Sequence, residues 1–151
     1  KAYERVANAR NDFQHKLSRQ IVDDNQAVIV ETLKVRNMMK NTCLAKHIGD
    51  ASWHALMTKL DYKAREQGKH LVKIDPWFAS SKTCHVCQHK RDAMPLNVRS
   101  WECPACHTQH DRDINAALNI KHQGIIELKA EGLSVSAHGG LRKSGTSSAA
   151  A

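Results

Sequence analysis

Residues 84–106 read CHVCQHKRDAMPLNVRSWECPAC, and this stretch decides how the second half of the chain folds. It begins with Cys84 and Cys87 and ends with Cys103 and Cys106, so two Cys-x-x-Cys units stand fifteen residues apart. Two residues between cysteines allow a tight turn to aim both thiolates at one point, and a short hairpin can join two such turns. Zinc is commonly held in proteins by a tetrahedron of four thiolates. The spacing predicts a zinc ribbon over about 80–110, with a structural Zn²⁺ that leaves no position for a reacting water.

Histidines surround both cysteine pairs and leave a second ligand set open. A site of three cysteines and one histidine would also satisfy zinc, although four cysteines already suffice. The alternative role for these histidines is a hydrogen bond or a phosphate contact at the surface of the ribbon. The histidines concerned are His85, His89, His107 and His110. The fifth cysteine, Cys43, has no partner in sequence, and we expect a small buried or half-buried side chain.

The basic charge of the chain is concentrated in one part of it. The 151 residues include 23 Lys and Arg against 15 Asp and Glu, a formal net charge of +8. Residues 26–82 contain ten of these cations against five acids. Such a surplus favours nucleic acid or another polyanion as partner, or else forms a solvated basic surface. No stretch approaches the roughly 18 to 20 apolar residues of a membrane span, and no signal-peptide pattern opens the chain, so we expect no membrane partner.

The apolar pattern predicts alternating helices and strands on both sides of a poorly patterned segment. Residues 1–22 predict an amphipathic helix, and 27–30 predict a buried strand that ends at Glu31. Residues 32–49 show no clean period and are interpreted as a loop or an irregular helix. A second helix can be capped by Asp50 or Ser52 and ended by Gly68, and a strand follows over 70–75. The apolar faces expected to pack are Tyr3, Val6, Phe13, Leu17 and Ile21, then Trp53, Leu56, Met57, Leu60 and Ala64.

A third helix is expected after the ribbon, where Asp111 and Asp113 begin it and Ile114, Ala117 and Leu118 share one face. From about residue 135 the composition turns to Ser, Gly and Ala, which predicts a disordered tail. The order of elements indicates an α/β core with the ribbon inserted before its last helix. Because two strands cannot make an independent sheet of useful size, the core is expected to be incomplete.

Three carboxylates are placed where metal ligands could stand. Glu31 ends an apolar strand, while Asp111 and Asp113 stand at a helix start. Two-metal nucleases need carboxylates that converge from separate elements beside the scissile phosphate. Each residue also has an ordinary interpretation, because a strand-end Glu is commonly solvated and Asp at a helix N-terminus caps free amides.

Four segments together resemble the OrfB/TnpB family, which bacterial insertion sequences encode. These segments are VIVETL at 28–33, SSKTCHVC at 80–87, WECPAC at 101–106 and HDRDINAALNI at 110–120. The resemblance runs over about residues 1–122 and implies a RuvC-like nuclease domain of RNase H-like fold, related to type V CRISPR effectors. It implies an RNA-guided, metal-dependent DNA endonuclease that is commonly labelled a transposase, with DNA and a guide RNA as partners. A bacterial cytoplasmic, nucleoid-associated location would follow.

The resemblance also implies catalytic residues and a division into domains. The family uses an Asp–Glu–Asp triad on Mg²⁺, in which Glu31 matches the middle member and Asp113 the last, with Asp111 as its neighbour. The expected division is nuclease core over 1–79, zinc ribbon over 80–110, last core helix over 111–122 and a mostly disordered tail over 123–151. The first Asp lies in the family on an opening strand that has no counterpart here. We therefore expect a C-terminal fragment or decayed copy with a partial RuvC-like core that does not cleave DNA alone. The alternative is a non-catalytic zinc-ribbon module that binds DNA or RNA, or a remnant of a mobile element.

Overall fold

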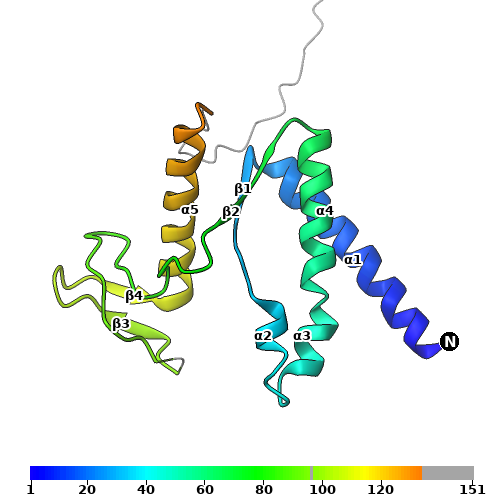
Figure 1. Ribbon diagram of the computed structural model, residues 1–151, viewed down its shortest axis with the longest axis horizontal. Coiled ribbons are helices and arrows are strands. Elements are labelled where there is room, and N and C mark those ends of the chain that lie inside the picture. The colour runs from blue at the N-terminus through cyan, green and yellow to red at the C-terminus, as the bar shows by residue number, and fades with distance from the viewer. Residues whose placement is uncertain (96, 134–151) are drawn as a thin grey trace, which may run out of the picture.

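The computed structural model describes residues 1–95 and 97–133, and it arranges them around a small parallel sheet (Figure 1). The long helix α1 (Ala2–Asp24) leads into strand β1 (Ala27–Glu31). Two short helices, α2 (Val35–Met38) and α3 (Ala45–Ala51), then precede α4 (Trp53–Glu66). Strand β2 (His70–Ile74) pairs in parallel with β1, so that Ala27 lies opposite His70 and Glu31 opposite Ile74.

The ribbon follows the sheet and carries its own pair of strands. Strands β3 (Ser100–Glu102) and β4 (Gln109–Asp111) pair antiparallel, and an isolated bridge joins Thr83 to Lys90. Helix α5 (Arg112–Ala130) begins directly at the end of β4 and packs against both β1 and β2. In Figure 1 this helix lies on one side of the sheet, while α4 and α1 lie on the other. Helix α5 therefore contacts both the parallel sheet and the ribbon strand β4.

The core between α1 and α4 is mixed in polarity. Its fully buried apolar members are Val22, Leu60 and Ala64. Beside them Lys63 crosses from α4 to α1, where its ammonium group donates to Ser18 Oγ at 2.8 Å. Helix α4 ends as the sequence predicts, because Gly68 takes a φ of +62° and the Lys69 N–H then returns to the carbonyl of Ala64.

Three sequence expectations about packing are wrong. In α1 the side chains of Tyr3, Val6 and Phe13 are exposed, because α4 contacts the face that carries Gln14, Ser18 and Val22 instead. Neither Asp50 nor Ser52 caps α4 through its side chain; both bind Arg10 of α1. Cys43, expected to be at least half-buried, is exposed.

The last helix also differs from its expected length and face. It continues beyond residue 122 to Ala130, because Gly124 and Leu128 are buried against the sheet and give its second half a packing partner. Its buried face carries Asn115 and Asn119, whereas Ile114 and Leu118 are exposed. Of the tail expected over 123–151, residues 123–130 are therefore helical, and 134–151 lie outside the described residues. None of the helices in the described ranges is long and apolar enough to cross a membrane.

Candidate functional site

The four cysteines of the ribbon meet at one point. The sulfur atoms of Cys84, Cys87, Cys103 and Cys106 all lie within 4.8 Å of one another. Cys84 and Cys106 are 3.7 Å apart, and Cys87 and Cys103 are 3.6 Å apart. A zinc ion bound tetrahedrally at about 2.3 Å from each sulfur requires sulfur–sulfur separations of about 3.8 Å. The cluster therefore has the size and the donor set that Zn²⁺ needs.

The backbone of each Cys-x-x-Cys unit has nearly the same conformation. Gln88 donates its N–H to the carbonyl of Cys84 at 2.9 Å, and His107 donates in the same way to Cys103 at 2.9 Å. Both donors have a positive φ, 62° for Gln88 and 57° for His107. This left-handed residue after the second cysteine closes the turn, so both cysteines of a unit point inward. The spacing predicted the tight turn within each unit and the meeting of the thiols.

One histidine supports the cysteines without replacing any of them. His110 is buried, and its Nε2 lies 3.1 Å from Cys84 Sγ, while its ring packs on Trp101 with centroids 4.6 Å apart. Burial first, and the neighbouring His85 second, lower the pKa of His110. A neutral imidazole with its proton on Nε2 would donate to the Cys84 sulfur, a common support for a metal ligand.

Charge is shared unevenly among the thiols. Hydrogen bonds from Thr108, the hydroxyl first and then the backbone N–H, lower the pKa of Cys106 to about 6. At Cys87 the backbone N–H of His89 favours the thiolate, but desolvation and the other three sulfurs outweigh it and raise the pKa to about 12. One thiolate is therefore easily formed, and a divalent cation is what would allow the remaining thiols to lose their protons.

The predicted carboxylate Glu31 lies at the carboxyl end of β1. It is half-buried, and its Oε1 accepts a hydrogen bond of 2.8 Å from the hydroxyl of Ser80. The carbonyl of Ser80 in turn accepts from Asn119 Nδ2 of α5 at 2.9 Å. The edge of the sheet that carries Glu31 is thus tied to α5 through one buried serine.

The two aspartates at the start of α5 have different roles. Asp111 is the N-cap, and its Oδ1 accepts from the backbone N–H groups of Asp113 and Ile114 at 2.9 Å each. Asp113 is exposed and pairs with Arg99 at 3.2 Å and with Arg112 at 3.5 Å. The ordinary interpretation of a helix-start Asp therefore describes Asp111, while the carboxylate of Asp113 is oriented by cations.

The structure assembles the cysteine site but not a complete acidic one. Within residues 1–95 and 97–133 the four cysteines are the only group of three or more potential metal ligands that converge. Glu31 and Asp113 lie on elements that pack together, yet each has its own partner, Ser80 and Arg99 respectively. In the part of the chain that the structure describes, the aspartates that precede β1 all belong to α1, so none of them lies on a strand.

Sequence reasoning missed the polar residues that join the ribbon, the sheet and α5. Asn115 Oδ1 accepts the backbone N–H of His85 at 3.0 Å, and its Nδ2 donates to the carbonyl of Thr83 at 2.8 Å. Asn119 donates to that carbonyl and to Ser80. The sequence did contain a signal for this face, because two asparagines four residues apart in a helix lie on the same side. The apolar residues beside them predicted that the opposite side would be buried.

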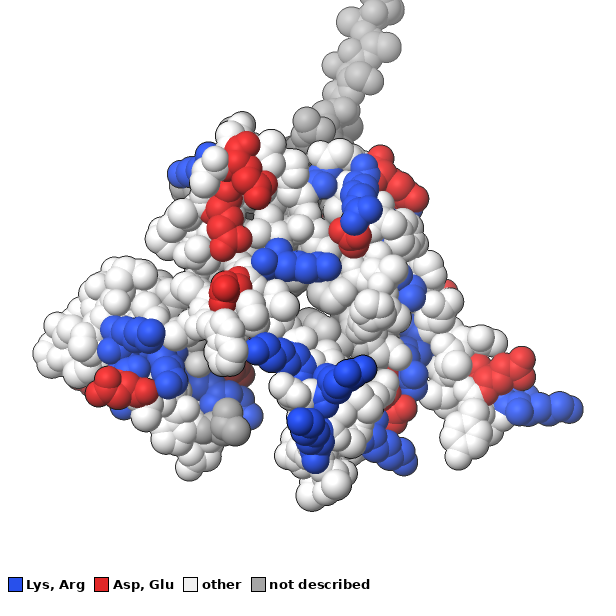
Figure 2. Space-filling model, in the orientation of Figure 1, with Lys and Arg blue, Asp and Glu red and all other residues white. Residues whose placement is uncertain are grey.

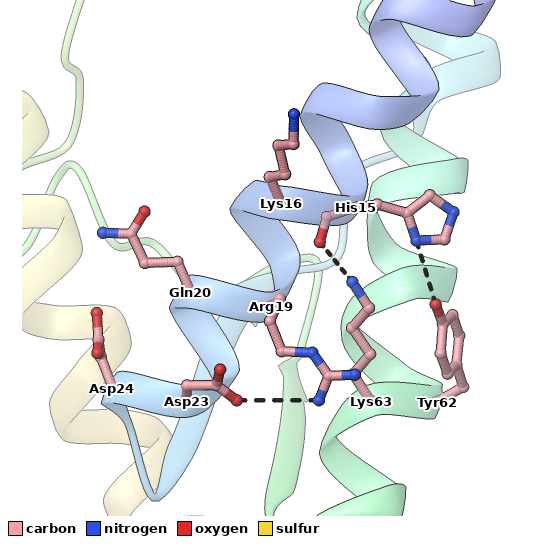
Figure 3. Close-up of a pocket in the computed structure, with 8 residues that line it drawn as sticks. All are labelled: His15, Lys16, Arg19, Gln20, Asp23, Asp24, Tyr62 and Lys63. Atoms are coloured by element: carbon pink, nitrogen blue, oxygen red, sulfur yellow. Dashed lines mark hydrogen bonds and ion pairs between the residues drawn. The ribbon is translucent and has the colours of Figure 1, made fainter.

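A separate open cavity of about 640 Å³ lies between α1 and α4 (Figure 3). Lys63 reaches across it to the carbonyl of His15, and Arg19 pairs with Asp23 on the α1 side. None of the predicted site residues lines it. Its lining consists of His15, Lys16, Arg19, Gln20, Asp23, Asp24, Tyr62 and Lys63.

Two family models match separate parts of the chain. Residues 53–120 match the model described as "Cas12f1-like, TNB domain", and residues 1–42 match the OrfB_IS605 model, described as "Probable transposase". The first match includes all four cysteines and Asp113, and the second includes Glu31.

Individual proteins match over most of the chain. A protein of Streptomyces pristinaespiralis, whose name proposes an RNA-guided DNA endonuclease, is 48% identical over 125 residues, which is 83% of this chain and 31% of that protein. The CRISPR-associated endodeoxyribonuclease Cas12f1 of Sulfoacidibacillus thermotolerans is 28% identical over 86% of this chain and 31% of its own length.

A solved structure shares the fold. A chain in the cryo-EM structure of a Cas12f1–sgRNA–target DNA complex superposes with a TM-score of 0.62 at 22% identity, over 78% of this chain and 35% of that one. The chain thus spans about a third of the length of the proteins that it matches. Through both family matches and these relatives, the chain is similar over most of its length to the OrfB/TnpB family of insertion-sequence proteins.

Proposed function

We propose that the chain is a C-terminal portion of an RNA-guided DNA endonuclease, with a partial RuvC-like core and a structural zinc ribbon. The observation that carries this proposal is the link from Glu31 through Ser80 to Asn119, which ties the carboxyl end of β1 to the helix whose first turn contains Asp113. Parallel strands bind ligands at their carboxyl ends, so Glu31 stands where a site is expected. The names of the relatives agree with this function.

Glu31 and Asp113 are the residues that we propose as Mg²⁺ ligands. Their oxygens are the hard donors that Mg²⁺ prefers. Bound Mg²⁺ would supply an activated water and charge stabilisation at a DNA phosphodiester. The protein's own contribution is to orient both carboxylates: Ser80 holds Glu31 by a hydrogen bond, and Arg99 and Arg112 pair with Asp113.

The described residues supply two carboxylates of the proposed triad, so we expect no cleavage by the chain alone. The test is Mg²⁺-dependent cutting of plasmid DNA, first by the chain and then with an N-terminal family fragment and its guide RNA added. Cutting by the chain alone that Glu31→Gln abolishes would contradict the missing-carboxylate argument. Glu4→Gln, which alters an exposed acid in the first turn of α1, is the matched control.

Asp111 and Asp113 can be distinguished in the same assay. Asn caps a helix about as well as Asp, so Asp111→Asn should retain both the helix and the activity of the assembled nuclease. Asp113→Asn removes a charged ligand and should abolish cutting. The reverse result would assign the metal to Asp111.

A binding module without catalysis is the second candidate, favoured by the distribution of charge. Lys and Arg side chains gather over α2 and α3 on the face shown in Figure 2. If these Lys and Arg side chains contact nucleic-acid phosphates, the affinity should fall steeply as the salt concentration rises. Salt-dependent binding by the chain, with no cutting even in the assembled mixture, would favour this candidate over the nuclease.

A further inference from the structure

Trp77 is an unusual surface residue, because this large aromatic residue is 79% exposed three positions after the end of β2. Its position is fixed by the backbone, since the Trp77 N–H donates to Asp75 Oδ1 at 2.6 Å and the Phe78 N–H donates to the carbonyl of Asp75 at 3.1 Å. The backbone of Trp77 is thus part of a turn that follows β2. Among the described residues, burial in the core does not account for a tryptophan at this place.

A cation lies against one face of the ring. The ammonium nitrogen of Lys34 is 3.7 Å from the ring centroid of Trp77, well within the range of a cation–π contact. Lys34 follows β1 as Trp77 follows β2, and these strands are parallel. Both residues therefore stand at the carboxyl edge of the sheet, the same edge that carries Glu31.

The surroundings of this pair are basic. Residues 32–49 contain four Lys or Arg and no Asp or Glu, and α2 and α3 form from this segment. The carboxylate of Asp75, the nearest acid in sequence to Trp77, is turned to the backbone N–H of Trp77. Lys34 and Arg36 follow β1 within a few residues, so an anionic ligand at this edge would lie beside a basic segment.

We propose that Trp77 and Lys34 form a platform for single-stranded DNA, on which a base stacks against the open face of Trp77 while Lys34 contacts a phosphate. Exposed aromatic rings beside cations are how single strands are bound without sequence preference. A duplex does not fit this chemistry, because its base faces are already stacked on one another. The choice of DNA as the strand rests on the proposed function, and the platform would lead that strand toward Glu31.

The test measures binding of a fluorescently labelled 12-residue oligo(dT) to the zinc-loaded full chain at several salt concentrations. Trp77→Ala should weaken binding about 5- to 100-fold, because stacking of one base is lost. Trp77→Phe should recover most of the affinity. Lys34→Met should reduce the slope of log K against log salt by about 0.7, the value for one phosphate contact on a single strand.

The control is Tyr3→Ala, which removes an aromatic ring that is 94% exposed on α1 and should leave binding unchanged. Equal affinity of Trp77→Ala and the parent chain would overturn the proposal, as would the absence of oligo(dT) binding by the parent. If duplex DNA binds as tightly as oligo(dT) and Trp77→Ala changes neither affinity, the surface makes phosphate contacts alone, and the proposal is overturned. The two proposals can fail separately. If Trp77→Ala loses oligo(dT) binding while the chain assembled with the N-terminal fragment and guide RNA does not cut DNA, the platform is supported and the nuclease function is rejected.

Discussion

Gly124 of α5 lies so close to Ile29 of β1 that a Cβ at this position would stand 2.7 Å from two atoms of the Ile29 side chain. Ile29 is β-branched and has little rotamer freedom with which to withdraw. The absence of a side chain at Gly124 is therefore what allows α5 to lie against the sheet.

Gly124→Ala should destabilise the chain by about 1–3 kcal/mol, because overpacking at this contact exceeds the gain in helix propensity. Urea unfolding of the zinc-loaded chain measures the effect. The double variant Gly124→Ala, Ile29→Ala should lose less stability than the sum of the losses in the two single variants, because Ala at position 29 leaves space for the added methyl group. Gly49→Ala is the control, since its added Cβ would lie 3.8 Å from Met39, an ordinary contact. A neutral Gly124→Ala would show that α5 is not held at this point.

Cys84→Ser and Cys103→Ser should each lose zinc and unfold the ribbon. The binding energy of structural zinc, about 10–16 kcal/mol, exceeds the whole stability of most domains. Trp101 packs on both cysteines, so its fluorescence should shift to that of an exposed ring. The core of Val22, Leu60 and Ala64 lies elsewhere and should unfold separately. Zinc content per chain is the direct measurement, with the exposed Cys43→Ser as control. One zinc per chain in Cys84→Ser would contradict the four-cysteine site.

His110→Ala should retain zinc but bind it about 10- to 100-fold less tightly. The cause is loss of the contact between His110 Nε2 and Cys84 Sγ, of the kind that supports metal ligands elsewhere. Competition with a chelator measures the affinity. His107→Asn is the control, because His107 is exposed and pairs with Glu102 at 3.0 Å, and Asn tolerates the left-handed backbone at this position. If His107→Asn and not His110→Ala weakens zinc binding, the wrong histidine has been assigned.

Stability should depend on Lys63 at alkaline pH. Burial first, then the charges of Arg19 and Lys59, lower the pKa of Lys63 from the ordinary 10.5. The unfolded chain therefore binds this proton more tightly than the folded chain does, so the Lys63 contribution to stability rises with pH between the lowered pKa and 10.5. Lys63→Met removes that contribution.

The free energy of unfolding, measured in urea at several pH values up to about 10, should rise less with pH in Lys63→Met than in the parent chain. Lys16→Met changes an exposed lysine in an i,i+4 pair with Asp12 and should leave the slope unchanged. If the free energy of unfolding changes with pH equally in the parent and in Lys63→Met, the lowered pKa of Lys63 does not contribute to stability as proposed.

Local patterns were enough to predict most of the elements. The run Ala27–Glu31 is a strand, Gly68 ends α4, and the spacing of the cysteines gives the turns that gather them. Each of these features depends on residues within a few positions of one another. The same segments also carried the resemblance that the family matches confirm.

Faces and lengths of helices could not be predicted in the same way. Tyr3 and Phe13 fit an apolar stripe, yet α4 packs elsewhere on α1. Ile114 and Leu118 likewise mark an apolar face of α5, while the buried face carries Asn115 and Asn119. Which face is buried depends on partners distant in sequence, and hydrogen bonds to Thr83 and Ser80 offset the cost of burying those amides.

The sequence by itself determined a four-cysteine ribbon beside an α/β unit, the position of Glu31 at a strand end and the resemblance to the OrfB/TnpB family. Only the tertiary structure decided how Ser80 links Glu31 to α5 and that Lys34 lies on the ring of Trp77. The physical reason is the range of the interactions. Turns and strand patterns are set by neighbours along the chain, whereas these contacts join residues brought together by the pairing of β1 with β2 and the packing of α5 on both.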